Sequence, residues 1–218
     1  MNQSLFFIQS DAFIGMDWHT FLIASIVLTL SPGPDIIYVL VQSMANGKKR
    51  GMAIALGLVS GIIIHTTLVA FGVAILIKQH EFLLILLKAF GTFYLIFLAY
   101  QVYKSNAKVD LNIDATSSST FFEAFRTGFI MNVLNPKVTL FFLAFLPSFL
   151  PKDSSSVVLD TYFLGLLFML QAIIIFGVVS LLADQLALKL RHHPVFNVIM
   201  KWAQVIVFLC IAGLLWFT

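Results

Sequence analysis

Cysteine and charged residues are both scarce in this chain of 218 residues. The single cysteine, Cys210, excludes a disulfide within the chain and a dithiol relay. Charged residues make up only 11% of the sequence, whereas an average soluble domain has about 25%. The chain also lacks a CxxC pattern, an HExxH pattern and a glycine-rich phosphate loop. We therefore expect neither a cofactor nor a bound metal.

Apolar residues, in contrast, make up 60% of the chain and gather in long runs. A helix needs about 20 mostly apolar residues to span a membrane. The sequence therefore predicts an all-α integral membrane protein with six transmembrane helices. The expected spans are 18–44, 51–77, 82–103, 125–150, 157–183 and 196–217.

Polar segments divide these spans into two groups of three. We expect an N-terminal tail at 1–17, a three-helix repeat at 18–103, a polar cytoplasmic linker at 104–120 and a second repeat at 121–218. The tail has no lysine or arginine, so it lacks the start of a signal peptide, and we expect it to lie at the interface or to be disordered. Lysine and arginine concentrate in the first, third and fifth loops, which predicts that these loops are cytoplasmic and both termini outside.

The first span of each group contains helix-breaking residues near its middle. Gly33-Pro34-Asp35 interrupts the first span, and Asn135-Pro136-Lys137 interrupts the fourth. A proline inside a helix removes a backbone donor, but it is well tolerated as the first residue of a new helix. We therefore expect two half-helices whose positive N-terminal ends point into the membrane centre. Because an odd number of spans inverts the second copy, the sequence predicts two inverted repeats around a central binding site.

Two charged residues lie within these breaks. A charge at the bilayer centre costs about 2.5–3.5 kcal/mol on insertion scales, and such residues are usually functional. We therefore expect Asp35 to take part in binding rather than to mark a plain proline kink. Lys137 occupies the matching position in the second half, where it either pairs with Asp35 or lifts its ammonium to the interface.

The second span of each group carries one polar residue in an apolar setting, His65 in the first and Gln171 in the second. Gly57, Gly61 and His65 follow one another at intervals of four, so they share one helix face. Two glycines at this spacing are typical of close packing between membrane helices. His65 is therefore predicted to point at a neighbouring helix, either as a satisfied structural histidine or as a proton carrier.

Three stretches resemble the lysine exporter and homoserine/threonine exporter family (LysE/RhtB type): SPGPDIIYVL, NGKKRGMAIALGLVSGIIIHT and GFIMNVLNPKVTLFFLAFLPSF. The resemblance covers nearly the whole chain. It implies a transporter and not an enzyme, one that exports homoserine-, threonine-, leucine- or lysine-like amino acids from the bacterial cytoplasm by proton antiport. The implied location is the inner membrane. The expected partners are an amino acid, protons and the lipid bilayer, with no nucleic acid, and a homo-oligomer is left open. The residues expected to bind substrate or protons are Ser31, Gly33, Pro34, Asp35, His65, Asn132, Asn135, Pro136 and Lys137.

Other functions fit the sequence less well. A channel would need a continuous polar lining, and the spans offer too few polar residues. A cation or metal-ion exporter of a related fold is the main alternative, although Asp35 and His65 are the only good ligand candidates inside the spans. An intramembrane protease would need a second membrane carboxylate, whereas Asp160 and Asp184 lie at span ends.

Overall fold

The computed structural model describes residues 16–73, 81–104, 120–151, 154, 156–183 and 196–217. Within these residues every regular element is a helix, as the sequence predicts. Three helices are long and apolar enough to cross a membrane, and two bent helix pairs raise that number to five if each pair counts as one span. The protein is therefore a multi-pass membrane protein.

The helices follow the predicted apolar runs closely. They are α2 (Trp18–Leu30), α3 (Pro34–Asn46), α4 (Lys48–Leu68), α6 (Glu81–Lys104), α7 (Phe121–Val133), α8 (Pro136–Leu140), α9 (Val157–Leu181) and α11 (Phe196–Leu214). Short π- and 3₁₀-helical turns extend two of them: η1 (Val69–Val73) after α4, and η2 (Phe141–Phe145) with η3 (Leu146–Phe149) after α8. Most of the predicted tail and of the polar linker, residues 1–15 and 105–119, lies outside the described residues.

Both predicted breaks are present. The chain bends by 53° between α2 and α3, and by 49° between α7 and the segment Pro136–Phe149. Pro34 and Pro136 are the first residues of α3 and α8, as the sequence predicts, because a proline at this position gives up no helical hydrogen bond. Each break therefore ends one helix and starts another inside the apolar bundle.

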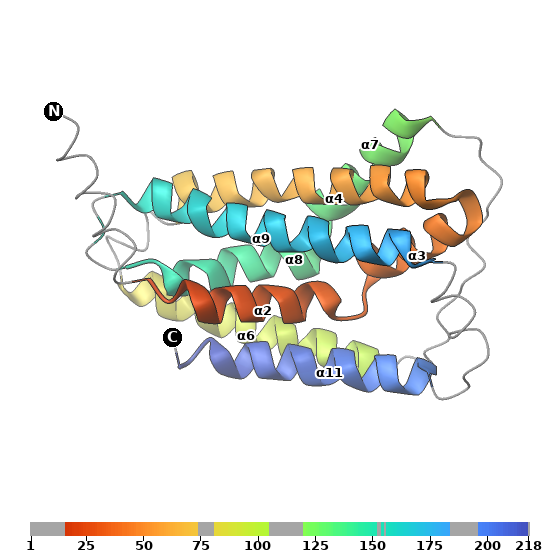
Figure 1. The fold of residues 1–218 in the computed structure, drawn as a ribbon. Helices are drawn as coiled ribbons and strands as arrows, with labels where there is room; N and C mark the ends of the chain where they lie inside the picture. Colours follow the sequence, from red (N-terminus) through yellow and green to blue (C-terminus); the bar gives the residue numbers. More distant parts are fainter. Residues whose placement is uncertain are drawn as a thin grey trace, which may run out of the picture.

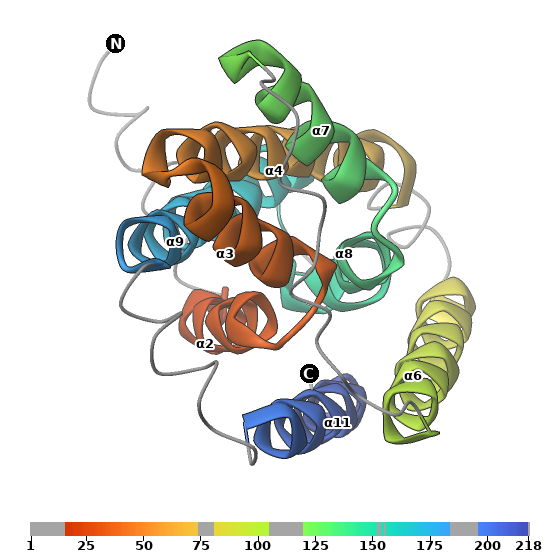
Figure 2. The ribbon, with the colours of Figure 1, turned by 90° about the vertical axis from the view of Figure 1, so that its right-hand side faces the viewer.

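The two bent pairs run in opposite directions. In Figure 1, α2 and α3 lead from the left end of the bundle to the right end, whereas α7 and α8 lead from right to left. The end view in Figure 2 shows α4 and α9 next to the bent pairs, while α6 and α11 lie side by side at one edge. The breaks are thus surrounded by other helices, so their exposed backbone groups can be satisfied by protein instead of lipid.

Glycines bring α4 and α7 into close contact. A Cβ atom on Gly57 would collide with the carbonyl oxygen of Phe125 and lie 2.8 Å from the backbone nitrogen of Phe129. In the other direction, a Cβ on Gly128 would collide with the carbonyl oxygen of Ile54. The predicted close-packing face of α4 is therefore confirmed, and α7 is the helix that it packs against.

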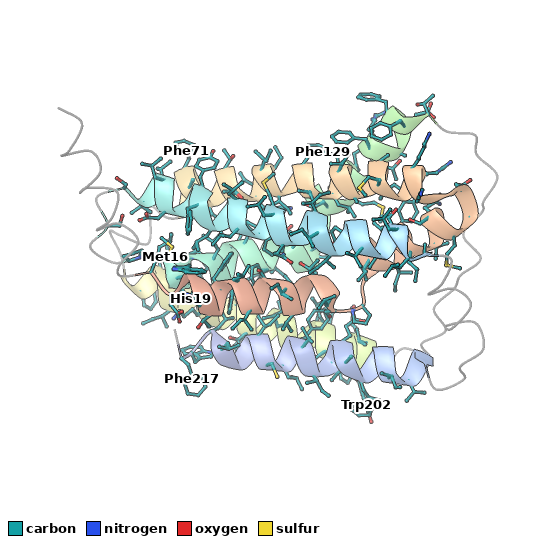
Figure 3. The ribbon with its side chains drawn as sticks, viewed as in Figure 1. Met16, His19, Phe71, Phe129, Trp202 and Phe217 are labelled. Atoms are coloured by element: carbon teal, nitrogen blue, oxygen red, sulfur yellow. The ribbon has the colours of Figure 1, made fainter. Side chains whose placement is uncertain are left out.

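The sixth predicted span differs most from expectation. α11 begins at the predicted residue, but the apolar part found in it, Lys201–Leu214, is shorter than a full span. α11 nevertheless packs against α6, where Trp216 Nε1 donates a hydrogen bond to Thr92 Oγ1 at 3.0 Å. Figure 3 labels Trp202, in the first half of α11, and Phe217, just after the end of this helix.

Candidate functional site

The two breaks meet through the side chain of Asn135. This residue caps the start of α8, where its Oδ1 accepts a hydrogen bond from the backbone N–H of Lys137 at 3.0 Å. Its Nδ2 donates to Oδ2 of Asp35, in the first turn of α3, at 2.7 Å. One amide group thus closes the start of one half-helix and binds the carboxylate at the start of the other.

Lys137 reaches from the second break to the first. Its side chain is buried, and Nζ donates to the backbone carbonyl of Ser31 at 2.9 Å. Ser31 is the C-cap of α2, where carbonyl groups have lost their helical donors and carry the negative end of the helix dipole. A Cβ on Gly33 would lie 3.4 Å from Nζ, so the lysine side chain passes close to the break. Within the described part of the chain no ion pair joins Lys137 directly to Asp35.

His65 makes the corresponding contact in the other direction. Its Nε2 lies 3.1 Å from the backbone carbonyl oxygen of Asn132, near the end of α7. A carbonyl can only accept, so Nε2 carries the hydrogen in this contact. Pro136, four residues after Asn132, has no N–H to donate, and the same carbonyl accepts a second hydrogen bond from the backbone N–H of Asn135 at 3.0 Å. His65 therefore points at a neighbouring helix, as predicted, and each break accepts a hydrogen bond from a basic side chain of the other half.

A small cavity lies between the breaks. Its volume is about 20 Å³, which is room for about one water molecule. Four of the predicted site residues line it: Ser31, Asp35, Asn132 and Lys137.

Three of these residues carry a buried oxygen with no hydrogen-bond partner. These atoms are Ser31 Oγ, Asp35 Oδ1 and Asn132 Oδ1. Leaving a buried polar atom unpaired costs about 1–3 kcal/mol, so such atoms are rare and call for a partner. Several acceptors around one small space suit a ligand that donates several hydrogen bonds, and an ammonium group is such a ligand.

Sequence reasoning missed one polar pair beside the cavity. Thr29 lines the cavity, and its Oγ1 accepts a hydrogen bond from Gln171 Nε2 at 2.9 Å and donates to the carbonyl of Ser25 at 2.8 Å. Gln171 Oε1 is buried and unpartnered as well. The isolated glutamine was visible in the sequence, but Thr29 is one polar residue in an apolar run, and only the packing of α2 on α9 joins them.

The structure brings all nine predicted site residues to the two breaks, although Pro34 and Pro136 act through the backbone alone. Cys210 is exposed on α11, away from the breaks. Asp160 is buried at the start of α9, where Ser154 Oγ donates to its carboxylate. Among the residues that the structure describes, no group of three or more histidine, cysteine or acidic side chains could hold a metal ion.

Comparisons with known proteins agree with these features. The homoserine/homoserine lactone efflux protein of Salmonella typhimurium (strain LT2) is 32% identical over 133 residues, which cover 61% of this chain and 64% of that protein. The leucine efflux protein of Salmonella choleraesuis (strain SC-B67) is 30% identical over 135 residues, which cover 62% of this chain and 64% of that protein. The matched stretch thus spans less than two thirds of either relative.

No solved structure matches the chain. Residues 26–217 match the family described as LysE type translocator, a range that includes both breaks, the cavity and all nine predicted site residues. The chain belongs to the family of LysE type translocators.

Proposed function

We propose that this protein is a secondary transporter that exports small molecules with an α-amino group, amino acids above all, from the bacterial cytoplasm in exchange for protons. The observation that carries the proposal is the cavity at the two breaks. Ser31, Asp35 and Asn132, each with an unpartnered buried oxygen, line it together with Lys137. The site therefore offers acceptors for a positive group and a donor for a negative one.

The names of the two relatives support an ammonium as the recognised group. They are described as efflux proteins for homoserine and homoserine lactone and for leucine. Homoserine and leucine have a free carboxylate, whereas a lactone has none, and all three have an α-amino group. A site that binds mainly the ammonium could accept all of these compounds. The unpartnered oxygens of the residues at the cavity are hydrogen-bond acceptors, which is what an ammonium requires.

The substrate would replace contacts that the protein now makes with itself. Its ammonium would donate hydrogen bonds to Asp35 Oδ1, Ser31 Oγ and Asn132 Oδ1. Its carboxylate, where present, would draw Lys137 Nζ away from the Ser31 carbonyl, helped by the positive N-terminal end of α3. Each new hydrogen bond gives a partner to an oxygen that is unpaired without substrate. The free energy that these unpaired atoms cost the empty protein therefore favours the bound state.

The described conformation is closed around the site. A cavity of about 20 Å³ holds a water molecule but no amino acid, so the helices must separate to admit one. Six spans in two inverted three-helix repeats, with breaks at matching places, would permit such a movement by rocking one repeat against the other. The opposite directions of the two bent pairs in Figure 1 support this arrangement.

Asp35 is the proposed proton carrier. It is a carboxylate that can be neutralised in place, it lines the cavity where the ammonium would bind, and its Oδ1 has no hydrogen-bond partner. A proton and a substrate ammonium would therefore compete for the same oxygen, which is the condition for exchange of one for the other. His65 is the second candidate, although Nε2 is engaged by the Asn132 carbonyl.

A metal-ion exporter is less well supported. Lys137 Nζ lies in the lining of the same cavity and would repel a cation that lacks a carboxylate of its own. The oxygen atoms could surround a small ion. A single carboxylate among them, however, supplies too little negative charge to balance a divalent ion.

Transport in proteoliposomes tests the proposal. Vesicles that contain the purified protein would be loaded with labelled amino acids, and efflux would be followed with and without an imposed pH gradient. We expect saturable efflux that accelerates with the gradient and is absent from protein-free vesicles. Gradient-independent leakage, or no flux of any amino acid, would overturn the proposal.

A further inference from the structure

We propose that the substrate has a neutral, aliphatic side chain, so that leucine-like amino acids are exported in preference to lysine-, glutamate- or homoserine-like ones. This inference rests on the proposed function, since it assigns the side chain of the same amino acid. It comes from the part of the cavity lining that the charged residues do not occupy.

The lining has a polar part and a larger apolar part. The polar part consists of Thr29, Ser31, Asp35, Asn132 and Lys137. The apolar part comes from five different helices and consists of Leu28, Ile36, Ile62, Val138, Phe168 and Phe176. A substrate whose ammonium meets the polar part must direct its side chain toward hydrocarbon.

A charged side chain of a substrate would find no free partner of opposite charge in this lining. Asp35 is the only carboxylate in it, and the α-ammonium of the substrate would occupy that carboxylate. The second ammonium of a lysine substrate would then face Leu28, Ile62 and the phenylalanines without an anion. A glutamate substrate would bring two carboxylates to the single ammonium of Lys137, one of them beside Asp35. Burying a charge without a partner is costly, so both classes are disfavoured.

A substrate with a hydroxylated side chain would gain few hydrogen bonds from this lining. Thr29 lines the cavity next to Leu28, and its Oγ1 already accepts a hydrogen bond from Gln171 and donates one to the Ser25 carbonyl. A substrate hydroxyl would displace one of these bonds or remain unpaired, because Gln171, whose Oε1 has no partner, is not among the residues that line the cavity, and Ser31 Oγ would bind the ammonium of the substrate. Homoserine should therefore bind more weakly than an aliphatic amino acid of similar size.

Packed aromatic rings limit the size of the side chain. Phe168 lies against Phe142 with ring centroids 5.1 Å apart and against Phe141 at 5.5 Å. All three are buried, so Phe168 cannot turn away without disturbing its neighbours. Truncation to alanine should enlarge the apolar part and admit an aromatic substrate.

Competition for export tests the inference. Proteoliposomes would be loaded with labelled leucine, and efflux would be measured with equal internal concentrations of unlabelled valine, lysine, glutamate or homoserine. We expect valine to compete well and the other three to require about tenfold higher concentrations or more. Phe168→Ala should let phenylalanine compete, whereas Phe90→Ala, which shortens an exposed ring on α6 outside the cavity, should leave the ranking unchanged.

A binding measurement keeps this test separate from transport. Protein in detergent would be melted with leucine or lysine present, and we expect leucine alone to raise the melting temperature. If lysine, glutamate or homoserine equals or exceeds leucine in both measurements, the side-chain assignment is wrong while the exporter proposal stands. If no amino acid is exported or raises the melting temperature, both are wrong.

Discussion

At each break a main-chain carbonyl accepts a hydrogen bond from a basic residue of the other half. Pro136 cannot donate to the Asn132 carbonyl, which accepts hydrogen bonds from the Asn135 backbone N–H at 3.0 Å and from His65 of the first half. The end of α2 leaves the Ser31 carbonyl free, and Lys137 of the second half donates to it. Asn135 adds a third link, to Asp35. The two breaks are therefore joined by side-chain hydrogen bonds. A substitution at one break should alter the conformation and stability of the other.

Removing the charge of Asp35 should abolish transport but not folding. Asp35→Asn keeps the shape and can still accept the hydrogen bond from Asn135, but it loses the charge and the titratable oxygen. A neutral amide is easier to bury than a carboxylate, which offsets part of the cost of leaving the buried charge of Lys137 alone, so the variant should still fold. Transport in proteoliposomes and size-exclusion profiles of the same preparation check both statements. Normal transport by the well-folded variant would make Asp35 a structural residue.

Asp35 and Lys137 should behave as one electrostatic unit, even though Asn135 and the Ser31 carbonyl take their hydrogen bonds. Removing one charge leaves the other uncompensated in a buried site, which is strongly destabilising. Lys137→Met alone should therefore lower stability in detergent, and adding Asp35→Asn should restore part of it without restoring transport.

A double-mutant cycle on the free energy of unfolding measures this coupling. Interacting residues typically give about 0.5–3 kcal/mol, while independent residues add within about 0.5 kcal/mol. Simple additivity would mean that the two charges do not sense each other across the cavity. Lys137 would then serve only as the cap of the Ser31 carbonyl.

At the scale of helices, the contact between α4 and α7 positions Asn132 for the site. Gly57 and Gly128 remove the side chains that would hold the two backbones apart, and Gly61 lies against the Asn132 side chain. This contact brings His65 within reach of the Asn132 carbonyl and holds the second break against α4. Its loss should reduce both stability and transport.

Gly57→Ala tests this contact. The new Cβ would collide with the Phe125 backbone, which cannot move without shifting α7, so we expect a loss of stability of about 1–3 kcal/mol. Gly213→Ala is the matched control, because a Cβ there meets nothing within 4 Å and alanine favours a helix by about 1 kcal/mol. Thermal unfolding in detergent compares the two. Equal melting temperatures would show that α4 and α7 separate at little cost.

The helices were predictable from the sequence because a membrane helix needs a long apolar run and a proline break stands out in one. Asn135 as a cap and Pro136 as a first residue follow from the same local rules, and the structure has both. The partner of Lys137 was not predictable, since it depends on where a main-chain carbonyl of α2 lies. The bond between Thr29 and Gln171 was hidden for the same reason, because two residues 142 positions apart meet only through packing.

At the scale of the whole molecule, charge is distributed unevenly between the two ends. In Figure 1 the starts of α4, α7 and α11 and the end of α6 lie at the right end of the bundle. These segments carry most of the basic residues that the structure describes: Lys48, Lys49, Arg50, Lys104, Arg126 and Lys201. Lys88, in the first half of α6, and Lys137, at the second break, are the exceptions among the described basic residues. Since positive loops remain in the cytoplasm, the right end should be cytoplasmic and the ends of α4 and α11 should face outside.

Thiol labelling of intact cells tests this orientation. Cys210→Ser removes the one native thiol, and single cysteines then replace Lys49 and Phe217, both of which are exposed. A maleimide that cannot cross the membrane should label Phe217→Cys at once but reach Lys49→Cys only after the cells are permeabilised. The reverse pattern would place the basic end outside. The charge rule would then fail for this chain, and substrate entering from the cytoplasm would meet the left end of the bundle first.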